Sequence, residues 1–160
     1  MIVLSIMPTL VLFQPKIPPN TGNIMRLCSN TGFKLHLIKP LGFDLDEKSL
    51  KRARLDYFTN ITPEIFEDLD IYCKKINMKN LLIITKFGRR NYTEAKFKNN
   101  SIIIFGSETS GLPKKFIKDH ESQTFKIPML NHNRSINLSN AAAIIAYEAW
   151  KNLNFSGVAY

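Results

Sequence analysis

Short apolar runs alternate along this chain with stretches in which apolar residues recur every three or four positions. Several of the short runs are continuously apolar, which is typical of strands covered on both faces. Together with the helical stretches between them, they predict an α/β fold with a mainly parallel sheet. The predicted strands are Leu10–Phe13, Lys34–Ile38, Leu81–Thr85, Ile102–Phe105 and Thr124–Ile127.

The helical stretches have recognisable ends and faces. A helix that starts near Asn20 should end before Gly32, which suits the position after a helix. In this helix Asn23, Arg26 and Asn30 share a polar arc beside the apolar one. Further helices are predicted over Glu47–Arg54, around Glu64–Ile76, in a short segment after Pro113, and over Leu138–Leu153.

Length, composition and charge narrow the class of protein. A chain of 160 residues with 44% apolar and 22% charged residues suits one domain, in which about residues 1–9 form an N-terminal extension. The 22 Lys and Arg exceed the 13 Asp and Glu by nine, and this net charge of +9 favours nucleic acid as partner, with an acidic membrane surface second.

The cysteines and the apolar runs exclude other classes. Cys28 and Cys73 are too few for a disulfide framework or a zinc cage, so we expect reduced core thiols in a cytoplasmic protein. No run approaches the ~20 apolar residues of a membrane span, and Met1–Phe13 lacks the pattern of a signal peptide.

Three polar segments follow predicted strands, and ligands of open α/β sheets bind at the carboxyl ends of strands. In the first segment, Pro18–Arg26, two interpretations stay open. Asn20 caps the helix while Asn23 and Arg26 remain in solvent, or these side chains face a phosphate or a ribose.

The second segment, Gly106–Pro113, has glycines spaced as in a phosphate-binding loop. Leu112 and Pro113 stand where that loop needs Lys and then Ser or Thr, so a nucleotide triphosphatase is excluded. No third glycine supports a dinucleotide site. The segment is a tight turn capped by Glu108, or a loop whose backbone approaches a flat ligand closely.

The third segment, from Ile127 to Asn140, is dense in Asn, Ser, Arg and His. Such side chains satisfy the backbone of their own loop or bind a ligand.

Together the three segments resemble the motifs of the SPOUT superfamily of RNA methyltransferases, and closely those of the small tRNA wobble-position 2′-O-ribose methyltransferases of the TrmL (YibK) type. The resemblance covers about residues 10–157. The matching residues are Asn20–Phe33, then Phe105–Gly106, Glu108–Thr109 and Gly111–Pro113, then Ile127–Met129, Arg134–Ser135 and Asn137–Asn140, with Tyr147–Trp150 beyond; Pro40–Phe43 and Leu55–Tyr57 also match.

The resemblance implies an α/β knot, in which the second and third motifs form a C-terminal deep trefoil knot. It also implies a homodimer in which the first and last helices pack across the two-fold axis. The apolar stripe of the last helix contains small residues such as Ala141, Ala142 and Ala149, which is compatible with close helix packing.

The implied cofactor is S-adenosylmethionine, with S-adenosylhomocysteine as product and no metal. Backbone groups around Ile83, Gly106, Ile127 and Ser135 are expected to hold its adenosine and methionine parts, and hydrophobic residues such as Met129 and Leu138 are expected to line a flat slot for the adenine. The other residues expected to bind it are Glu108, Gly111 and Asn140. Among these, Glu108 should hold the loop against the first helix rather than titrate. Gly106→Val should abolish cofactor binding because a branched side chain would fill the slot.

The implied reaction is attack of a ribose 2′-oxygen on the methyl group. Arg26 is the expected catalytic residue, and Asn23 and Ser135 are expected to orient the ribose. A guanidinium stays charged at neutral pH and cannot act as a free base. Arg26 should therefore act together with a substrate phosphate or stabilise the developing oxyanion.

Binding of a tRNA anticodon stem-loop is expected from the surface of this single domain. The expected RNA-binding residues are Asn20, Asn30, Lys48, Lys51, Arg52, Arg54, Tyr57 and Arg134, with Arg89 and Arg90 as further candidates. Each basic residue could instead belong to a solvated face, and Tyr57 could be structural rather than a base-stacking residue.

The predicted function is 2′-O-methylation of the wobble nucleotide, cytidine or a modified uridine, in tRNA anticodons. Two alternatives remain within the resemblance: a methyltransferase for another tRNA or rRNA nucleotide, and a non-catalytic RNA-binding knot protein. A third alternative is a phosphate-binding enzyme that acts on a small molecule.

Overall fold

A computed structural model describes residues 6–44 and 61–159 of the chain, and in them it contains a parallel sheet of seven strands. The strand order is β3-β2-β1-β6-β4-β7-β5. Neighbouring strands pair in parallel throughout, with Leu10 of β1 beside Leu35 of β2 and Ile103 of β6. The strands are β1 (Thr9–Phe13), β2 (Lys34–Ile38), β3 (Glu64–Phe66), β4 (Leu81–Ile84), β5 (Arg90–Asn91), β6 (Ile102–Phe105) and β7 (Thr124–Lys126).

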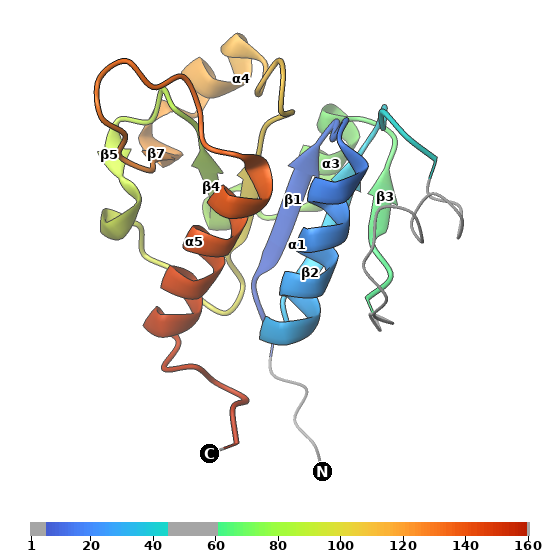
Figure 1. The fold of residues 1–160 in the computed structure, drawn as a ribbon, viewed down its shortest axis with the longest axis vertical. Helices are drawn as coiled ribbons and strands as arrows, with labels where there is room; N and C mark the ends of the chain where they lie inside the picture. Colours follow the sequence, from blue (N-terminus) through green and yellow to red (C-terminus); the bar gives the residue numbers. More distant parts are fainter. Residues whose placement is uncertain (1–5, 45–60, 160) are drawn as a thin grey trace.

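Helices cover both faces of the sheet, which explains why its central strands are apolar on both sides. Helices α1 (Pro18–Thr31) and α5 (Leu138–Asn152) lie side by side on one face (Figure 1). Helices α3 (Leu69–Lys75) and α4 (Lys114–Asp119) pack against the other face. Short 3₁₀ turns at Met78–Asn80, Tyr92–Glu94 and Glu121–Gln123 complete the described elements.

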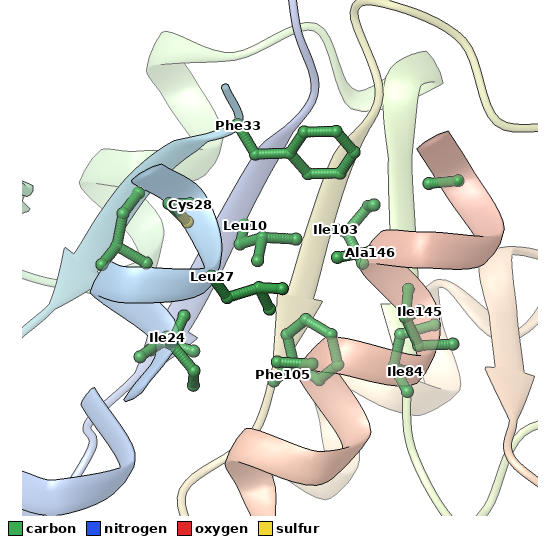
Figure 2. Packing of buried hydrophobic residues seen from close by; sticks show 14 of the residues in the cluster. Leu10, Ile24, Leu27, Cys28, Phe33, Ile84, Ile103, Phe105, Ile145 and Ala146 are labelled. Atoms are coloured by element: carbon green, nitrogen blue, oxygen red, sulfur yellow. The ribbon is translucent and has the colours of Figure 1, made fainter. Parts of the chain in front are cut away.

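The larger core lies between the sheet and the pair α1 and α5. Ile24 and Leu27 of α1 and Ile145 of α5 point toward Leu10 and Ile103 of the central strands (Figure 2). Cys28 belongs to this core, as expected for a core thiol, and its burial raises the pKa of the thiol to about 12. Cys73 is only half-buried.

One predicted helix begins in the wrong place. The segment predicted as a helix around Glu64–Ile76 starts with strand β3, which pairs with β2 at the edge of the sheet. The chain then turns, and Asp68 caps α3 by accepting a hydrogen bond from the amide of Ile71 at 2.7 Å. The two-residue strand β5 was not predicted. The helix predicted over Glu47–Arg54 lies outside the described residues.

Helix α1 ends as predicted but begins earlier. Gly32 has a φ of 75° and its amide donates to the carbonyl of Cys28 at 2.8 Å, which is the expected glycine termination. At the other end Pro18 and Pro19 occupy the first turn, where a missing amide hydrogen costs nothing. Asn20 is therefore inside the helix, so its side chain is not the N-cap.

The expected boundaries near the N-terminus shift slightly. Strand β1 begins at Thr9, and the carbonyl of Pro8 accepts a hydrogen bond from the amide of Lys34 at 3.0 Å. The last residues of the expected N-terminal extension therefore belong to the fold. The α/β class and the parallel sheet are confirmed, whereas the trefoil knot stays a prediction. Among the described helices, none is long and apolar enough to cross a membrane.

Candidate functional site

A cavity of about 640 Å³ lies at the carboxyl ends of β4, β6 and β7, beside the first turns of α1 and α5. The three polar segments identified in the sequence all contribute to its wall. The residues expected to bind cofactor or RNA that line it are Asn20, Gly106, Glu108, Gly111, Ile127, Met129, Arg134, Ser135 and Leu138.

The loop after β6 is a closed turn. The amide of Ser107 donates to the carbonyl of Gly111 at 3.2 Å, and the amide of Gly111 donates back to the carbonyl of Ser107 at 2.9 Å. Gly111 has a φ of 66°, which favours glycine. A Cβ on Gly106 would lie 2.5 Å from the carbonyl carbon of Gly111. A side chain at Gly106 would therefore displace the backbone of the loop itself, which differs from the slot-filling effect expected for Gly106→Val.

Glu108 joins this loop to the start of α1, as expected. Its carboxylate accepts hydrogen bonds from the amides of Lys16 at 2.8 Å and Ile17 at 3.1 Å, and from Nδ2 of Asn20 at 3.1 Å. The carboxylate of Glu108 therefore satisfies two backbone amides just before α1. No side chain of the N-cap residue of α1 does this.

Asn137, in the third polar segment, is hydrogen-bonded to Asn20 and so joins the contacts between Glu108 and Asn20. Its Nδ2 donates to Oδ1 of Asn20 at 3.0 Å, while its Oδ1 accepts from the amides of Ser139 and Asn140 and caps α5. Asn20 is buried, with 4% of its surface exposed. Both ends of the Asn20 amide are used within the protein, so its predicted role in RNA binding does not match these contacts.

The expected ribose-orienting and catalytic residues lie in two places. Ser135 is exposed and lines the cavity. Asn23, Arg26 and Asn30 lie on the exposed side of α1 and are outside the cavity lining. The helix carries Asn23 and Arg26 roughly one and two turns away from Asn20, so they border the site rather than enclose the cavity.

Some cofactor-binding predictions do not coincide with the cavity. The side chain of Ile83 is fully buried in the core under α3 and α4, whereas its neighbour Ile84 lines the cavity. Successive residues of a strand point to opposite faces, which accounts for the difference. The contact expected from backbone groups around Ile83 stays a prediction. Asn140 is exposed and is not part of the lining.

The predicted basic contacts are distributed unevenly. Arg89 forms an ion pair with Glu121, and the guanidinium of Arg90 donates to the carbonyl of Ser122 at 2.5 Å while lying over the ring of Phe125. Both side chains are thus held against the β7 side of the fold. The remaining predicted contacts, Lys48, Lys51, Arg52, Arg54 and Tyr57, lie outside the described residues.

Among the cavity-lining residues that the sequence analysis did not name as site candidates are Asn137, Lys86, Phe87 and Lys114. Asn137 was one amide among many polar residues in its segment, and nothing local distinguished it. Lys86 and Phe87 directly follow a predicted strand, and that position was the available signal for them.

Comparisons with known proteins agree on the family. The sequence profile of the SpoU rRNA Methylase family matches residues 7–147. A tRNA (cytidine(34)-2'-O)-methyltransferase from Methylovorus glucosotrophus is 43% identical over 152 residues, which cover 92% of this chain and 97% of the relative.

Solved structures resemble nearly the whole chain. A structure from work on the 2-OH methylation of C/U34 on tRNA superposes with a TM-score of 0.83 at 36% identity, covering 92% of this chain and 97% of the other. AviRb from Streptomyces viridochromogenes, a SpoU methyltransferase solved with S-adenosylmethionine, shares the fold with a TM-score of 0.77 at 21% identity, over 96% of this chain and 60% of its own. Since the profile match and the identity both extend over most of its length, the chain belongs to the SpoU rRNA Methylase family.

Proposed function

We propose that this protein transfers a methyl group from S-adenosylmethionine to the ribose 2′-oxygen of nucleotide 34, the wobble position, of tRNA. The observation that carries the proposal is 43% identity to a tRNA (cytidine(34)-2'-O)-methyltransferase along nearly the full length of both chains. The net charge of +9 agrees with a polyanionic substrate.

The cavity has the chemistry that an adenosine derivative requires. Ile127, Met129 and Leu138 give it an apolar wall, and the loop at Gly106–Gly111 presents backbone groups to it. Flat apolar slots with a few fixed polar groups are typical cofactor sites. The hydroxyl of Ser107, in the same wall, is buried without a hydrogen-bond partner in the described part of the chain. When bound, S-adenosylmethionine supplies a methyl group activated by a sulfonium sulfur.

Side chains in and beside the cavity would orient the ribose, stabilise the charge that develops on its 2′-oxygen, and contact the RNA. Ser135 at the cavity and Asn23 on α1 would orient the ribose through hydrogen bonds to its hydroxyls. Arg26 would neutralise charge that develops on the 2′-oxygen as its proton leaves, or hold the adjacent phosphate in a bidentate contact. Arg134, which is exposed and lines the cavity, would contact the RNA backbone.

We also infer that two copies of the chain associate and that the protein works in the cytoplasm, where tRNA is modified. Ile144 and Tyr147 on α5 are 38% and 47% exposed, and an apolar surface of this kind favours a partner helix. Sedimentation at micromolar concentration would test the dimer.

The function is tested with labelled S-adenosylmethionine and bulk tRNA from cells that lack this gene. Nuclease digestion and mass spectrometry locate the label. A 2′-O-methyl group on nucleotide 34 is the expected result. Label on another nucleotide would keep the reaction but change the substrate. Cofactor binding without transfer to any RNA would favour a non-catalytic RNA-binding protein, and transfer without RNA would favour a small-molecule enzyme.

A further inference from the structure

Phe87 is an exposed aromatic residue at the mouth of the cavity. It lines the cavity, yet 62% of its surface is accessible. It follows the end of β4, at the same edge of the sheet as the loops that build the proposed site. A single exposed apolar side chain is ordinary in proteins, so its significance depends on how the backbone holds it and on what surrounds it.

The backbone holds Phe87 at the tip of a fixed turn. The amide of Gly88 donates to the carbonyl of Thr85 at 3.0 Å, and the amide of Phe87 donates to Oγ1 of Thr85 at 3.3 Å. On the two sides of the turn, Thr85 and Arg89 donate their amides to Phe125 and Thr124 of β7.

Gly88 fixes the turn further. A Cβ on Gly88 would lie 2.2 Å from the carbonyl carbon of Phe125, so the turn lies directly against the backbone of β7. The Phe87 ring is therefore presented to solvent by a rigid support. A platform fixed in this way binds a flat ligand with little loss of conformational entropy.

Three cationic side chains line the same cavity as the Phe87 ring, and one of them lies beside the ring. Lys86 places its Nζ 5.2 Å from the centre of the Phe87 ring, and Lys114 of α4 and Arg134 of the loop after β7 line the same cavity. All three cations are exposed, and none forms an ion pair with a carboxylate in the described part of the chain. Glu108, which also lines the cavity, directs its oxygens to the start of α1.

We propose that Phe87 is a stacking platform for a nucleobase of the substrate RNA beside the methylated nucleotide, and that Lys86, Lys114 and Arg134 contact the phosphates of the same strand. The proposal rests on the function proposed above and adds the residues that bind the unpaired nucleotides of the anticodon loop. Single-stranded nucleic acid is bound by this combination of aromatic faces and cations. A protein or lipid partner would not need an exposed ring and three cations in the lining of one cavity.

The test measures binding of an anticodon stem-loop RNA by fluorescence anisotropy, with S-adenosylhomocysteine present. Phe87→Ala should weaken RNA binding about tenfold, because base–aromatic stacking is lost. Phe87→Tyr keeps an aromatic face and should bind nearly as the wild type does. Phe87→Leu keeps the apolar area without the ring and should resemble Phe87→Ala. Calorimetry on the same variants should give unchanged affinity for S-adenosylhomocysteine.

Placing 2-aminopurine in turn at each loop position of the RNA identifies the stacked base. Its fluorescence should be quenched at one position by the wild type and recover with Phe87→Ala. Wild-type RNA affinity in Phe87→Ala or Phe87→Leu would overturn the proposal. Loss of S-adenosylhomocysteine affinity in these variants would also overturn it, because the ring would then belong to the cofactor pocket.

The cations are tested through salt dependence. The logarithm of RNA affinity falls linearly with the logarithm of salt concentration, and Lys114→Gln should make this slope shallower by about 0.7, the value for one phosphate contact of a single strand. Lys98→Gln, which removes the same charge just before β6 at the opposite edge of the sheet, is the matched control and should leave the slope unchanged. Equal slopes for both variants would refute the phosphate contact. Methyl transfer by the wild type reports separately on the proposed function: if transfer occurs while Phe87→Ala binds RNA normally, only the stacking proposal fails.

Discussion

Asn137 donates a hydrogen bond from Nδ2 to Oδ1 of Asn20 at 3.0 Å, across 117 residues of sequence. Asn20 in turn donates to Glu108, so one buried amide joins the starts of α1 and α5 to the loop after β6. All three residues line the cavity. The shape of the proposed cofactor site therefore depends on a network in which each amide has a definite orientation, because donor and acceptor ends are not interchangeable.

Asn20→Asp tests this network. The substitution keeps the shape of the side chain but replaces the donor that faces Glu108 with a second carboxylate oxygen. We expect the free energy of unfolding at pH 7 to fall by about 1–3 kcal/mol, as for a buried group that loses its partner. Urea denaturation measures the change. The loss should be smaller at pH 5, because protonation of one carboxyl restores a donor between the pair.

Asn23→Asp is the matched control for Asn20→Asp. It makes the same chemical change on the exposed side of α1, three residues further along. Its stability should stay within about 0.5 kcal/mol of the wild type, as for most surface substitutions. Equal decreases in the free energy of unfolding of the two variants would show that the buried hydrogen bonds of Asn20 do not stabilise the fold more than a surface residue does.

Gly106→Ala should impair cofactor binding through the backbone. The new Cβ would lie 2.5 Å from the carbonyl carbon of Gly111, so the turn closed by Ser107 and Gly111 must move. Calorimetry should show at least a tenfold loss of S-adenosylmethionine affinity, which corresponds to about 1.4 kcal/mol.

Gly111→Ala provides the comparison for Gly106→Ala. At Gly111 no atom lies within 4 Å of the added Cβ, and the cost is confined to a φ of 66°. We expect a loss of stability of about 1 kcal/mol and a smaller loss of cofactor affinity than in Gly106→Ala. The reverse order would mean that the close approach of Gly106 to Gly111 does not shape the site.

Arg26→Ala should abolish methyl transfer while cofactor binding is retained. Arg26 lies on the exposed side of α1, outside the cavity lining, so its loss leaves the cofactor wall intact. Single-turnover transfer to tRNA and calorimetry with S-adenosylmethionine separate the two effects. Arg26→Lys keeps the charge but not the bidentate fork, and it should recover only part of the rate. A rate near that of the wild type in Arg26→Ala would refute the catalytic assignment.

The two thiols should differ in reactivity. Cys28 is fully buried and its pKa is raised to about 12, so at pH 8 it is both inaccessible and protonated. Cys73 is half-buried. Its pKa is also raised, mainly by burial and to a smaller extent by the negative charge of the nearby Asp70. A thiol reagent should modify Cys73 slowly and Cys28 only after unfolding. Mass spectrometry of the partly modified protein distinguishes the sites, and early labelling at Cys28 would contradict its position in the core.

The parts of the fold that could be predicted from sequence are those with a local cause. Strands β2 and β6 were predicted at their observed ends because turn residues or polar residues flank their apolar runs. Strand β3 is three residues long, and its Ile65 is 42% exposed, so it has no pattern distinct from the helix that follows. Its pairing with β2 is a property of the sheet rather than of the segment.

The site shows the same division. That three loops would meet followed from their places after parallel strands. The link from Asn137 to Asn20 did not follow, because it depends on how α1 and α5 lie against each other. The rotation of a strand also decides which residue of a pair faces the cavity, and it places Ile84 there rather than Ile83.

Stability should fall as the pH decreases from 7 toward 5, because of a histidine remote from the cavity. In His36 on β2, the Nδ1 atom lies 3.0 Å from Oη of Tyr72 on α3, and the Nε2 atom lies 3.5 Å from Oε2 of Glu64 on β3. Burial lowers the pKa of His36 below its ordinary 6.5, Glu64 opposes this shift, and Lys34 adds to it. Below pH 6.5 the unfolded chain therefore binds a proton that the folded protein takes up only at lower pH, and the folded state loses stability over that interval.

Urea denaturation at a series of pH values measures this effect. His36→Gln removes the titrating group and should flatten the dependence between pH 7 and 5, whereas His132→Gln, in the exposed loop after β7, should leave it unchanged. Glu64→Gln should make the wild-type dependence steeper, because Glu64 is the group that favours the protonated imidazole. Wild-type stability that instead rises from pH 7 to pH 5, with the rise lost in Glu64→Gln, would mean that the ion pair outweighs burial and that His36 stabilises the folded protein in its charged form.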